Sequence, residues 1–301
     1  MLFVTPSPTS TDAAQMICQR FKIDQVRFTN SGTESTMYAV RVARSASDKM
    51  GILKVEGGYH GSYDPFVVSA KPPLDKAGDP EEPTAVMDSN LVPGDIYVVP
   101  YNNAPALEAM FEKNASKIAC FIVEPVLENL AIILPDAGYL ERVRELCDEY
   151  NVILIFDEVK TGLTAGAHGA SVRLGVEPDL ITLAKSIGGG VPLAAFGGKK
   201  KYMDFVTNGK MAHFGTFNGN PLAMAGVRAI DRLCTDEALA AAEELNQQAL
   251  DRISEIIDEY QLPAHTVGFG VKGCVTWSPT PVRNYRDYKA TDFGIAEAHW
   301  L

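Results

Sequence analysis

The chain has 301 residues, of which 46% are hydrophobic, so it is long enough to bury a sizeable core and to form one large domain with part of another. Its 27 lysines and arginines stand against 38 aspartates and glutamates, and the resulting formal net charge of −11 argues against nucleic acid or an anionic membrane as a partner. The five cysteines include no C-x-x-C pair and the five histidines lack metal-ligand spacing, which predicts reduced thiols, a cytoplasmic location and no metal site.

The first predicted elements are a short strand at residues 26–28 and a helix after it. The motif Asn30-Ser31-Gly32-Thr33-Glu34 begins a segment with the apolar spacing of a helix. Hydroxyls and free backbone N–H groups at a helix N-terminus make a ready anion site. An ordinary serine or threonine cap explains the same motif, and for the motif alone it is the more common arrangement.

The next motif is the loop Gly57-Gly58-Tyr59-His60-Gly61, which holds an aromatic ring and an imidazole between glycines. The Tyr59 ring could stack on a planar cofactor, whereas a plain turn with a packed tyrosine is equally ordinary. Residues 72–93 then predict a polar, proline-bearing loop that is long enough to be functional.

A βαβ unit is predicted in the middle of the chain. Residues 118–123 form its first strand, Asp136 is expected to cap a helix with apolar Leu140, Val143 and Leu146, and residues 152–156 form the second strand. The uninterrupted apolar run at 152–156 is typical of a strand covered on both faces in a parallel sheet.

Asp157 follows this buried strand directly. A carboxylate there is costly unless a cation meets it, and a protonated pyridine nitrogen is a reasonable partner because ligands gather at the carboxyl ends of such strands. A turn cap or a pair with a structural arginine is about as common an explanation.

Lys185 is the candidate for an amine nucleophile. It follows a predicted buried strand at 178–184 and precedes Gly188-Gly189-Gly190, which allow the backbone to approach a ligand. Lys160 is a rival whose neighbours predict an exposed turn, and Lys199-Lys200-Lys201 is expected to be a solvated surface run. A lysine with a nearby anionic group is what a pyridoxal-phosphate enzyme requires.

The C-terminal part predicts a long helix at 236–260 that links two domains. The segment Gly268-Phe269-Gly270-Val271-Lys272-Gly273 matches G-x-G-x-x-G, but residues 274–277 after it predict a strand, whereas a dinucleotide site needs a helix there. We therefore do not expect a dinucleotide site.

Six motifs occur in order along the chain: Asn30-Ser31-Gly32-Thr33-Glu34, Gly58-Tyr59-His60-Gly61, Val123-Glu124-Pro125, Phe156-Asp157-Glu158-Val159, Lys185 with Gly188-Gly189-Gly190, and Gly215-Thr216-Phe217-Asn218-Gly219-Asn220-Pro221. With these motifs the chain resembles the class III aminotransferases of pyridoxal-phosphate fold type I, especially the branch that contains glutamate-1-semialdehyde aminomutase. The resemblance implies an α/β fold: a three-layer αβα large domain with a mostly parallel sheet, followed by the start of a small C-terminal α/β domain.

The resemblance also implies roles for single residues. Lys185 would hold the cofactor as a Schiff base and move the proton between cofactor and substrate carbons, while Asp157 would bind the pyridinium. Val159, two residues farther along the same strand, would pack on one side of the ring and Tyr59 on the other. The phosphate would be held by Ser31, Gly32 and Thr33, with Thr216 reaching it from a neighbouring subunit. Glu124 matches a carboxylate near the cofactor, and Asn129 matches an asparagine that bonds the ring hydroxyl.

Three features depart from the family pattern. Glu128 replaces the small residue expected before Asn129, and residues 69–74 replace the Gly/Ser-rich gating loop of the aminomutase. The upstream arginine that binds the substrate carboxylate in many members has no counterpart, because the chain is expected to be truncated at both ends. We expect a large domain at 1–235 without its N-terminal segment, and a linking helix with an incomplete small domain at 236–301.

The resemblance thus predicts an aminotransferase that moves an amino group between an amino compound and a keto acid with pyridoxal 5'-phosphate, acting as a homodimer without nucleic-acid or membrane partners. Two alternatives stay open. One is the aminomutase, an isomerase that transfers the amino group within one molecule. The other is a catalytically idle, truncated homologue.

Overall fold

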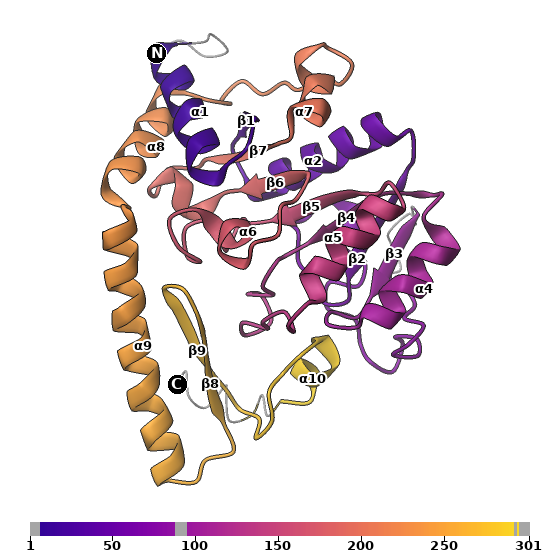
Figure 1. The fold of residues 1–301 in the computed structure, drawn as a ribbon, viewed down its shortest axis with the longest axis vertical. Helices are drawn as coiled ribbons and strands as arrows, with labels where there is room; N and C mark the ends of the chain where they lie inside the picture. The colour runs from indigo at the N-terminus through magenta and orange to yellow at the C-terminus, as the bar shows by residue number, and fades with distance from the viewer. Residues whose placement is uncertain (1–6, 88–94, 292–293, 295–301) are drawn as a thin grey trace.

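A seven-stranded sheet forms the centre of the computed structural model, which describes residues 7–87, 95–291 and 294 (Figure 1). The strands lie in the order β1-β7-β6-β5-β4-β2-β3. Their bounds are β1 Gln25–Thr29, β2 Gly51–Val55, β3 Ile96–Val99, β4 Ile118–Val123, β5 Ile153–Asp157, β6 Leu180–Leu183 and β7 Ala194–Gly198. Strands β3, β2, β4, β5 and β6 are mutually parallel, and β7 pairs antiparallel with both β6 and β1.

Two layers of helices cover the sheet. The larger helices are α1 Pro8–Phe21, α2 Gly32–Ser47, α4 Ala104–Asn114, α5 Tyr139–Glu149, α7 Lys200–Thr207, α8 Pro221–Leu233 and α9 Asp236–Glu259. The shorter ones are α3 Asp64–Val67, α6 Gly169–Leu174, α10 Tyr285–Lys289 and the 3-10 turn η1 Lys185–Gly188. The three-layer fold with a mostly parallel sheet confirms the predicted fold class.

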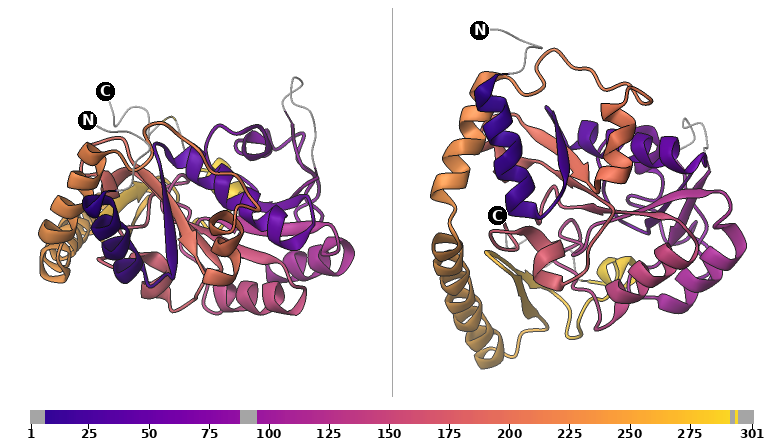
Figure 2. Two further views of the ribbon diagram at one scale, coloured as in Figure 1. Left: turned by 90° about the horizontal axis from the view of Figure 1, so that it is seen from above. Right: turned by 45° about the horizontal axis from the view of Figure 1, so that its top comes forward.

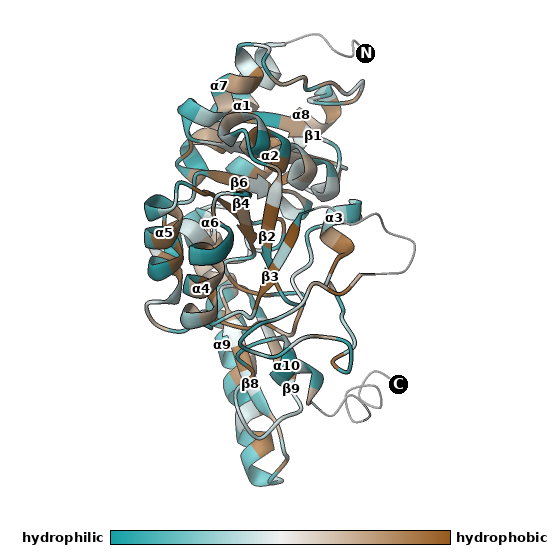
Figure 3. Ribbon diagram, turned by 90° about the vertical axis from the view of Figure 1, so that its right-hand side faces the viewer, coloured by the Kyte–Doolittle hydropathy of each residue, from teal (hydrophilic) through white to brown (hydrophobic). Residues whose placement is uncertain are grey.

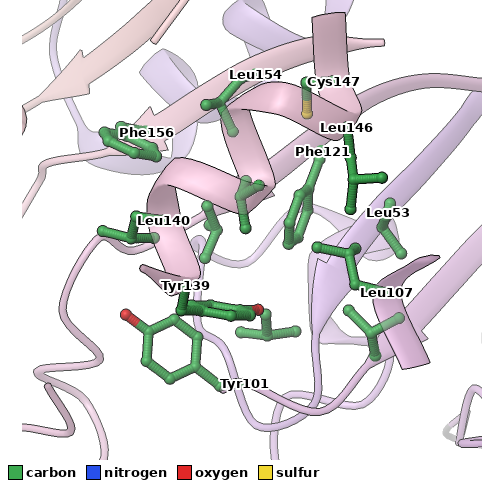
Figure 4. Close-up of a cluster of buried hydrophobic side chains, with 14 of the residues drawn as sticks. Leu53, Tyr101, Leu107, Phe121, Tyr139, Leu140, Leu146, Cys147, Leu154 and Phe156 are labelled. Atoms are coloured by element: carbon green, nitrogen blue, oxygen red, sulfur yellow. The ribbon is translucent and has the colours of Figure 1, made fainter. Parts of the chain in front are cut away.

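The alternation of side chains along each strand decides which layer each side chain meets. Leu154 and Phe156 of β5 lie in the cluster formed with α4 and α5, which Figure 4 shows, whereas Ile153 and Ile155 pack in the cluster under α2 and α7. A third cluster joins α1 and α8, which lie side by side in Figure 2, to Leu183 of β6. Figure 3 shows β2 as mostly hydrophobic and much of α5 as hydrophilic, as this layering requires.

The C-terminal part leaves the sheet along α9 (Figure 1). Beside α9 lies a hairpin of β8 His265–Phe269 and β9 Lys272–Thr276. The G-x-G-x-x-G segment is the turn of this hairpin, where Gly270 has a φ of 61°, and Gly268 and Gly273 pack against Leu250 of α9. The expected strand after the motif and the long helix are both confirmed, although α9 begins with Thr235 as its cap and ends at Glu259.

One predicted cap is wrong. Helix α5 begins after Gly138, which has a φ of 82°, so Asp136 lies two residues before the cap position. The carboxylate of Asp136 instead forms an ion pair with Arg283, and its backbone N–H donates to Asn102 Oδ1 at 2.9 Å. A glycine in the left-handed conformation allows the turn that separates Asp136 from the helix. No helix within the described ranges is long and apolar enough to cross a membrane.

Candidate active site

A cavity of about 120 Å³ lies at the carboxyl ends of the parallel strands, where the loops after β2, β4, β5 and β6 meet the N-terminus of α2. It is lined by Gly32, Thr33, Tyr59, His60, Gly61, Glu124, Asn129, Asp157, Val159, Lys160 and Lys185. Eight of the ten residues that the sequence singled out therefore lie together. The other two, Ser31 and Thr216, do not line the cavity.

Asp157 is the last residue of β5 and is 4% exposed. Its Oδ1 accepts hydrogen bonds from the Thr182 hydroxyl at 3.0 Å and from the backbone N–H of Val159 at 3.1 Å. The bond from Val159 is the turn cap that was the alternative to a ligand role, so Asp157 both caps the turn and faces the cavity. Strand β5 ends at Asp157, so Val159 reaches the cavity from this turn and not, as expected, from the same strand.

His60 is a buried partner of Asp157 that the sequence reasoning left out of the site. Its Nδ1 lies 2.8 Å from Asp157 Oδ2, and since an ionised carboxylate only accepts, Nδ1 carries the hydrogen. Burial lowers the pKa of His60, and the hydrogen bond that His60 donates to Asp157 opposes this effect. A neutral imidazole thus orients the carboxylate. The glycine-flanked loop signalled an unusual imidazole, but the contact depends on the order of β2, β4 and β5, which the sequence leaves open.

Glu124, just after β4, is 2% exposed and faces the same cavity. It accepts hydrogen bonds from Asn129 Nδ2 at 2.9 Å and from the backbone N–H of Tyr59 at 3.3 Å. Burial, with the nearby charge of Asp157, raises the pKa of Glu124 to about 8. Tyr59, by contrast, has 43% of its surface exposed, so its ring is available at the mouth of the cavity.

Lys185 begins η1 after the short strand β6 and lines the cavity. Its backbone is in the left-handed region, with a φ of 51°. A lysine in this conformation carries strain, which residues at functional sites commonly retain. The side chain is exposed and not, as expected, held at a buried strand end, so the amine is accessible.

The N-terminus of α2 forms one end of the cavity. Ser31 forms a capping box with Glu34: the Glu34 N–H donates to Ser31 Oγ at 3.3 Å, and Glu34 Oε2 accepts from the Ser31 N–H at 3.0 Å. The ordinary cap is therefore present for Ser31. Gly32 packs closely on the methyl groups of Val159, where a Cβ would lie 3.1 Å from one of them, and Thr33 remains on the cavity wall.

Lys160 corrects another expectation, because it is half-buried and lines the cavity where an exposed turn was predicted. Its ammonium donates to the backbone oxygen of Glu128 at 2.7 Å. Burial lowers the pKa of Lys160, and the neighbouring charge of Lys272 lowers it further. The Glu128 carboxylate itself forms an ion pair with Lys272.

Thr216 lies on a different surface. It is exposed and lines a wider hollow of about 540 Å³ together with Phe28, His213 and Phe214. Asn30 connects this hollow to the start of α2, since its Nδ2 donates to Asn218 Oδ1 at 2.8 Å. Thr216 therefore does not line the cavity of its own chain.

Comparison with known proteins agrees with this geometry. The model of the family "Aminotransferase class-III" matches residues 2–288. A glutamate-1-semialdehyde 2,1-aminomutase from Opitutus terrae is 39% identical over 297 residues, which cover 96% of this chain and 68% of the relative. The chain spans between 55% and 69% of the length of the curated relatives compared, and less than two thirds of most of them.

Solved structures show the same architecture. An omega-transaminase from Sphaerobacter thermophilus is 32% identical, with a TM-score of 0.88 over 95% of this chain and 67% of that one. A glutamate-1-semialdehyde-aminomutase from Pseudomonas aeruginosa in complex with PMP has a TM-score of 0.86 over 99% of this chain and 67% of that one. At 24% identity the second similarity supports the fold alone.

Proposed function

The chain belongs to the class III aminotransferase family, and we propose that it is a pyridoxal-phosphate-dependent aminotransferase that moves an amino group between an amino compound and a keto acid. The observation that carries the proposal is the meeting of Asp157 and Lys185 in one cavity. The first is a buried carboxylate held by three donors, and the second is an accessible amine on a strained backbone.

The residues present fit pyridoxal phosphate. Asp157 would bind the ring nitrogen, Gly32 and Thr33 at the start of α2 would bind the phosphate, and Tyr59 and Val159 would pack on the ring. When bound, the cofactor supplies a carbonyl group and a ring that withdraws electrons. Ser31 would help indirectly, since its hydroxyl caps the helix whose N–H groups would bind the phosphate.

The protein's own steps are the positioning of charge and the transfer of a proton. The Asp157 carboxylate would hold a proton on the ring nitrogen, with His60 Nδ1 fixing its orientation at 2.8 Å. Lys185 Nζ would take a proton from one substrate carbon and return it at another position. Glu124 would orient Asn129 toward the ring hydroxyl.

The direct test is to locate the lysine that holds the cofactor. Sodium borohydride fixes the cofactor on that lysine, and peptide mapping should find it on Lys185. Lys185→Ala should remove both the label and the visible absorbance of the bound cofactor, whereas Lys160→Ala should keep the label on Lys185. Label on Lys160 in the unchanged protein would refute the assignment.

Two alternatives remain open. The similarity to the Opitutus terrae aminomutase supports an intramolecular transfer, and a catalytically idle homologue is the third possibility. A purified, cofactor-loaded chain should separate the three. An aminotransferase requires a keto acid to regenerate the starting cofactor form, an aminomutase converts one substrate alone, and an idle chain shows no change in absorbance with amines.

We further propose that the working unit is a cytoplasmic homodimer in which Thr216 reaches the partner's phosphate site. The exposure of Thr216 on a surface outside its own cavity supports this arrangement. We also propose a division into a large domain at 1–235 and a smaller part at 236–301, since α9 carries the chain away from the sheet (Figure 1).

A further inference from the structure

Three charged side chains from different elements meet beside the cavity: Lys160 after β5, Glu128 after β4, and Lys272 at the start of β9. The Glu128 carboxylate already has partners, because it forms an ion pair with Lys272 and accepts a hydrogen bond from the Thr164 hydroxyl at 3.4 Å. Among the described residues, the Lys160 ammonium donates to one acceptor, the neutral backbone oxygen of Glu128, at 2.7 Å. Of these three, Lys160 alone lines the cavity.

Lys160 is held by hydrogen bonds at its backbone and at its side-chain nitrogen. At the backbone end, its carbonyl oxygen accepts from the Thr164 hydroxyl at 2.6 Å and from Lys272 Nζ at 3.5 Å. At the side-chain end, the bond to Glu128 fixes the nitrogen. An ammonium group has three N–H donors, so two remain after this bond. A fixed cation with free donors is well suited to bind an anion at little entropic cost.

Asp157 and Glu124, the two carboxyl groups that line the cavity, form no hydrogen bond with the Lys160 ammonium among the described residues. Asp157 accepts from His60, Thr182 and the Val159 N–H, and Glu124 accepts from Asn129 and the Tyr59 N–H. Burial also raises the pKa of Glu124 to about 8, which favours its neutral form. Within the described part of the chain, no carboxylate forms an ion pair with Lys160. The cation is therefore left for a group that enters the cavity.

We propose that Lys160 determines substrate specificity by binding a carboxylate of the amino compound, so that the chain prefers amino acids to simple amines. This inference rests on the proposed function and names the substrate class of the same site. Lys160 would contact the substrate directly through a charge-assisted hydrogen bond. Glu128 and Lys272 would act through Lys160, as positioning residues.

The test compares donors that differ by one carboxylate: β-alanine against ethylamine, 4-aminobutanoate against propylamine, and L-glutamate against 4-aminobutanoate. Lys160→Met removes the charge and keeps an unbranched side chain of similar length. In the cofactor-loaded protein it should lower kcat/KM for at least one carboxylate-bearing donor by about 10-fold or more, mainly through KM, and leave the matched amine unchanged. Lys160→Arg should retain the preference. Lys113→Met on exposed α4 is the control for the loss of one charge.

A binding measurement gives a readout that needs no turnover. Propanoate and glutarate carry no amine, and calorimetry should find that Lys160→Met weakens the binding of at least one of them by about 10-fold or more. If no donor reacts with the unchanged protein but this binding difference is present, the proposed function fails and the role of Lys160 stands.

Two outcomes would overturn the inference. In the first, Lys160→Met affects carboxylate-bearing donors and matched amines equally. In the second, it weakens retention of pyridoxal phosphate or the melting temperature while carboxylate binding is unchanged, which would make Lys160 a cofactor contact or a support for the Glu128 loop. If the methionine variant does not fold, Lys160→Gln provides the same comparison.

Discussion

The surroundings of Asp157 hold its carboxylate in one orientation. Three donors bind its carboxylate at distances of 2.8 to 3.1 Å in a place where an unpaired charge would be costly. These donors fix the direction of the free lone pairs before any ligand arrives. A carboxylate held in this way needs no reorganisation when a cation binds.

We expect Asp157→Asn to slow the half-reaction with an amino donor by roughly 10² or more, the scale seen when a preorganised electrostatic group is removed from a site. Stopped-flow absorbance of the loaded protein measures this rate. Unchanged proton transfer in the variant would show that Asp157 does not hold the ring nitrogen. Asp95→Asn, outside the cavity, is a matched control.

The raised pKa of Glu124 predicts that the stability of the cofactor-free protein depends on pH. Its pKa is raised from 4.5 to about 8, so the folded state keeps a proton that the unfolded state releases. Its stabilising contribution is therefore fully present below about pH 4.5 and is lost as the pH rises toward 8. Glutamine does not titrate, so Glu124→Gln should not lose this contribution. The free energy of unfolding of the variant minus that of the unchanged protein should therefore rise by on the order of 3 kcal/mol from pH 5 to pH 8.

Urea unfolding at several pH values checks this expectation, and Glu112→Gln on the exposed side of α4 provides the comparison. A difference between Glu124→Gln and the unchanged protein that stays constant from pH 5 to 8 would contradict a raised pKa for Glu124.

At the scale of elements, α10 connects the C-terminal part to the end of β2. Arg286 donates to both carboxylate oxygens of buried Glu56 at 3.1 Å and to the Gly78 backbone oxygen at 2.8 Å. The hydroxyl of Tyr285 donates to the Pro72 backbone oxygen at 2.9 Å. Residues 72–78 of the loop after β2 are thus bound to an element more than two hundred residues later in the sequence.

We expect Arg286→Met to lower the free energy of unfolding by about 3 kcal/mol, because it leaves Glu56 buried without its cation. The double variant Arg286→Met with Glu56→Gln should recover a large part of this loss, since it removes the stranded charge as well. Chemical denaturation of the four proteins of this double-mutant cycle measures the coupling. A purely additive cycle would show that the pair contributes no coupling energy.

Local patterns predicted the elements that depend on neighbouring residues. The apolar run of β5, the cap at Ser31 and the long helix α9 are all present where periodicity and capping rules place them. The antiparallel pairing of β7 with β1 and β6 was not predicted, because strand order depends on packing between distant segments. The His60–Asp157 contact and the Lys160 cluster escaped prediction for the same reason.

At the scale of the whole molecule, the surface around Thr216 predicts a dimer. Phe214 is 81% exposed and Leu222 is 58% exposed beside the hollow that Thr216 lines. Covering these side chains with a second copy would remove apolar surface from water. We expect Phe214→Ser to shift the protein toward monomers in light scattering and to weaken retention of pyridoxal phosphate together with it.

Thr216→Ala separates the two effects, because it should weaken cofactor retention while the dimer persists. In mixed dimers with a Lys185→Ala subunit, the defect should occur in the cavity opposite the altered threonine. Full cofactor retention by a strictly monomeric form of the unchanged protein would rule out the shared site.

The ion pair between Lys272 and Glu128 connects the hairpin that packs on α9 to the loop after β4, beside the cavity. The turn of the hairpin contacts Asn246, which lies about 15 Å along α9 from its first residue, so a tilt of about 5° at the first turn of the helix would move the turn of the hairpin by about 1.3 Å. The hairpin packed along α9 carries Lys272 to the rim of the cavity, where a shift of that size exceeds the tolerance of a hydrogen bond. A small rotation of the C-terminal part about the start of α9 would therefore be enough to break the bond between Lys272 and Glu128.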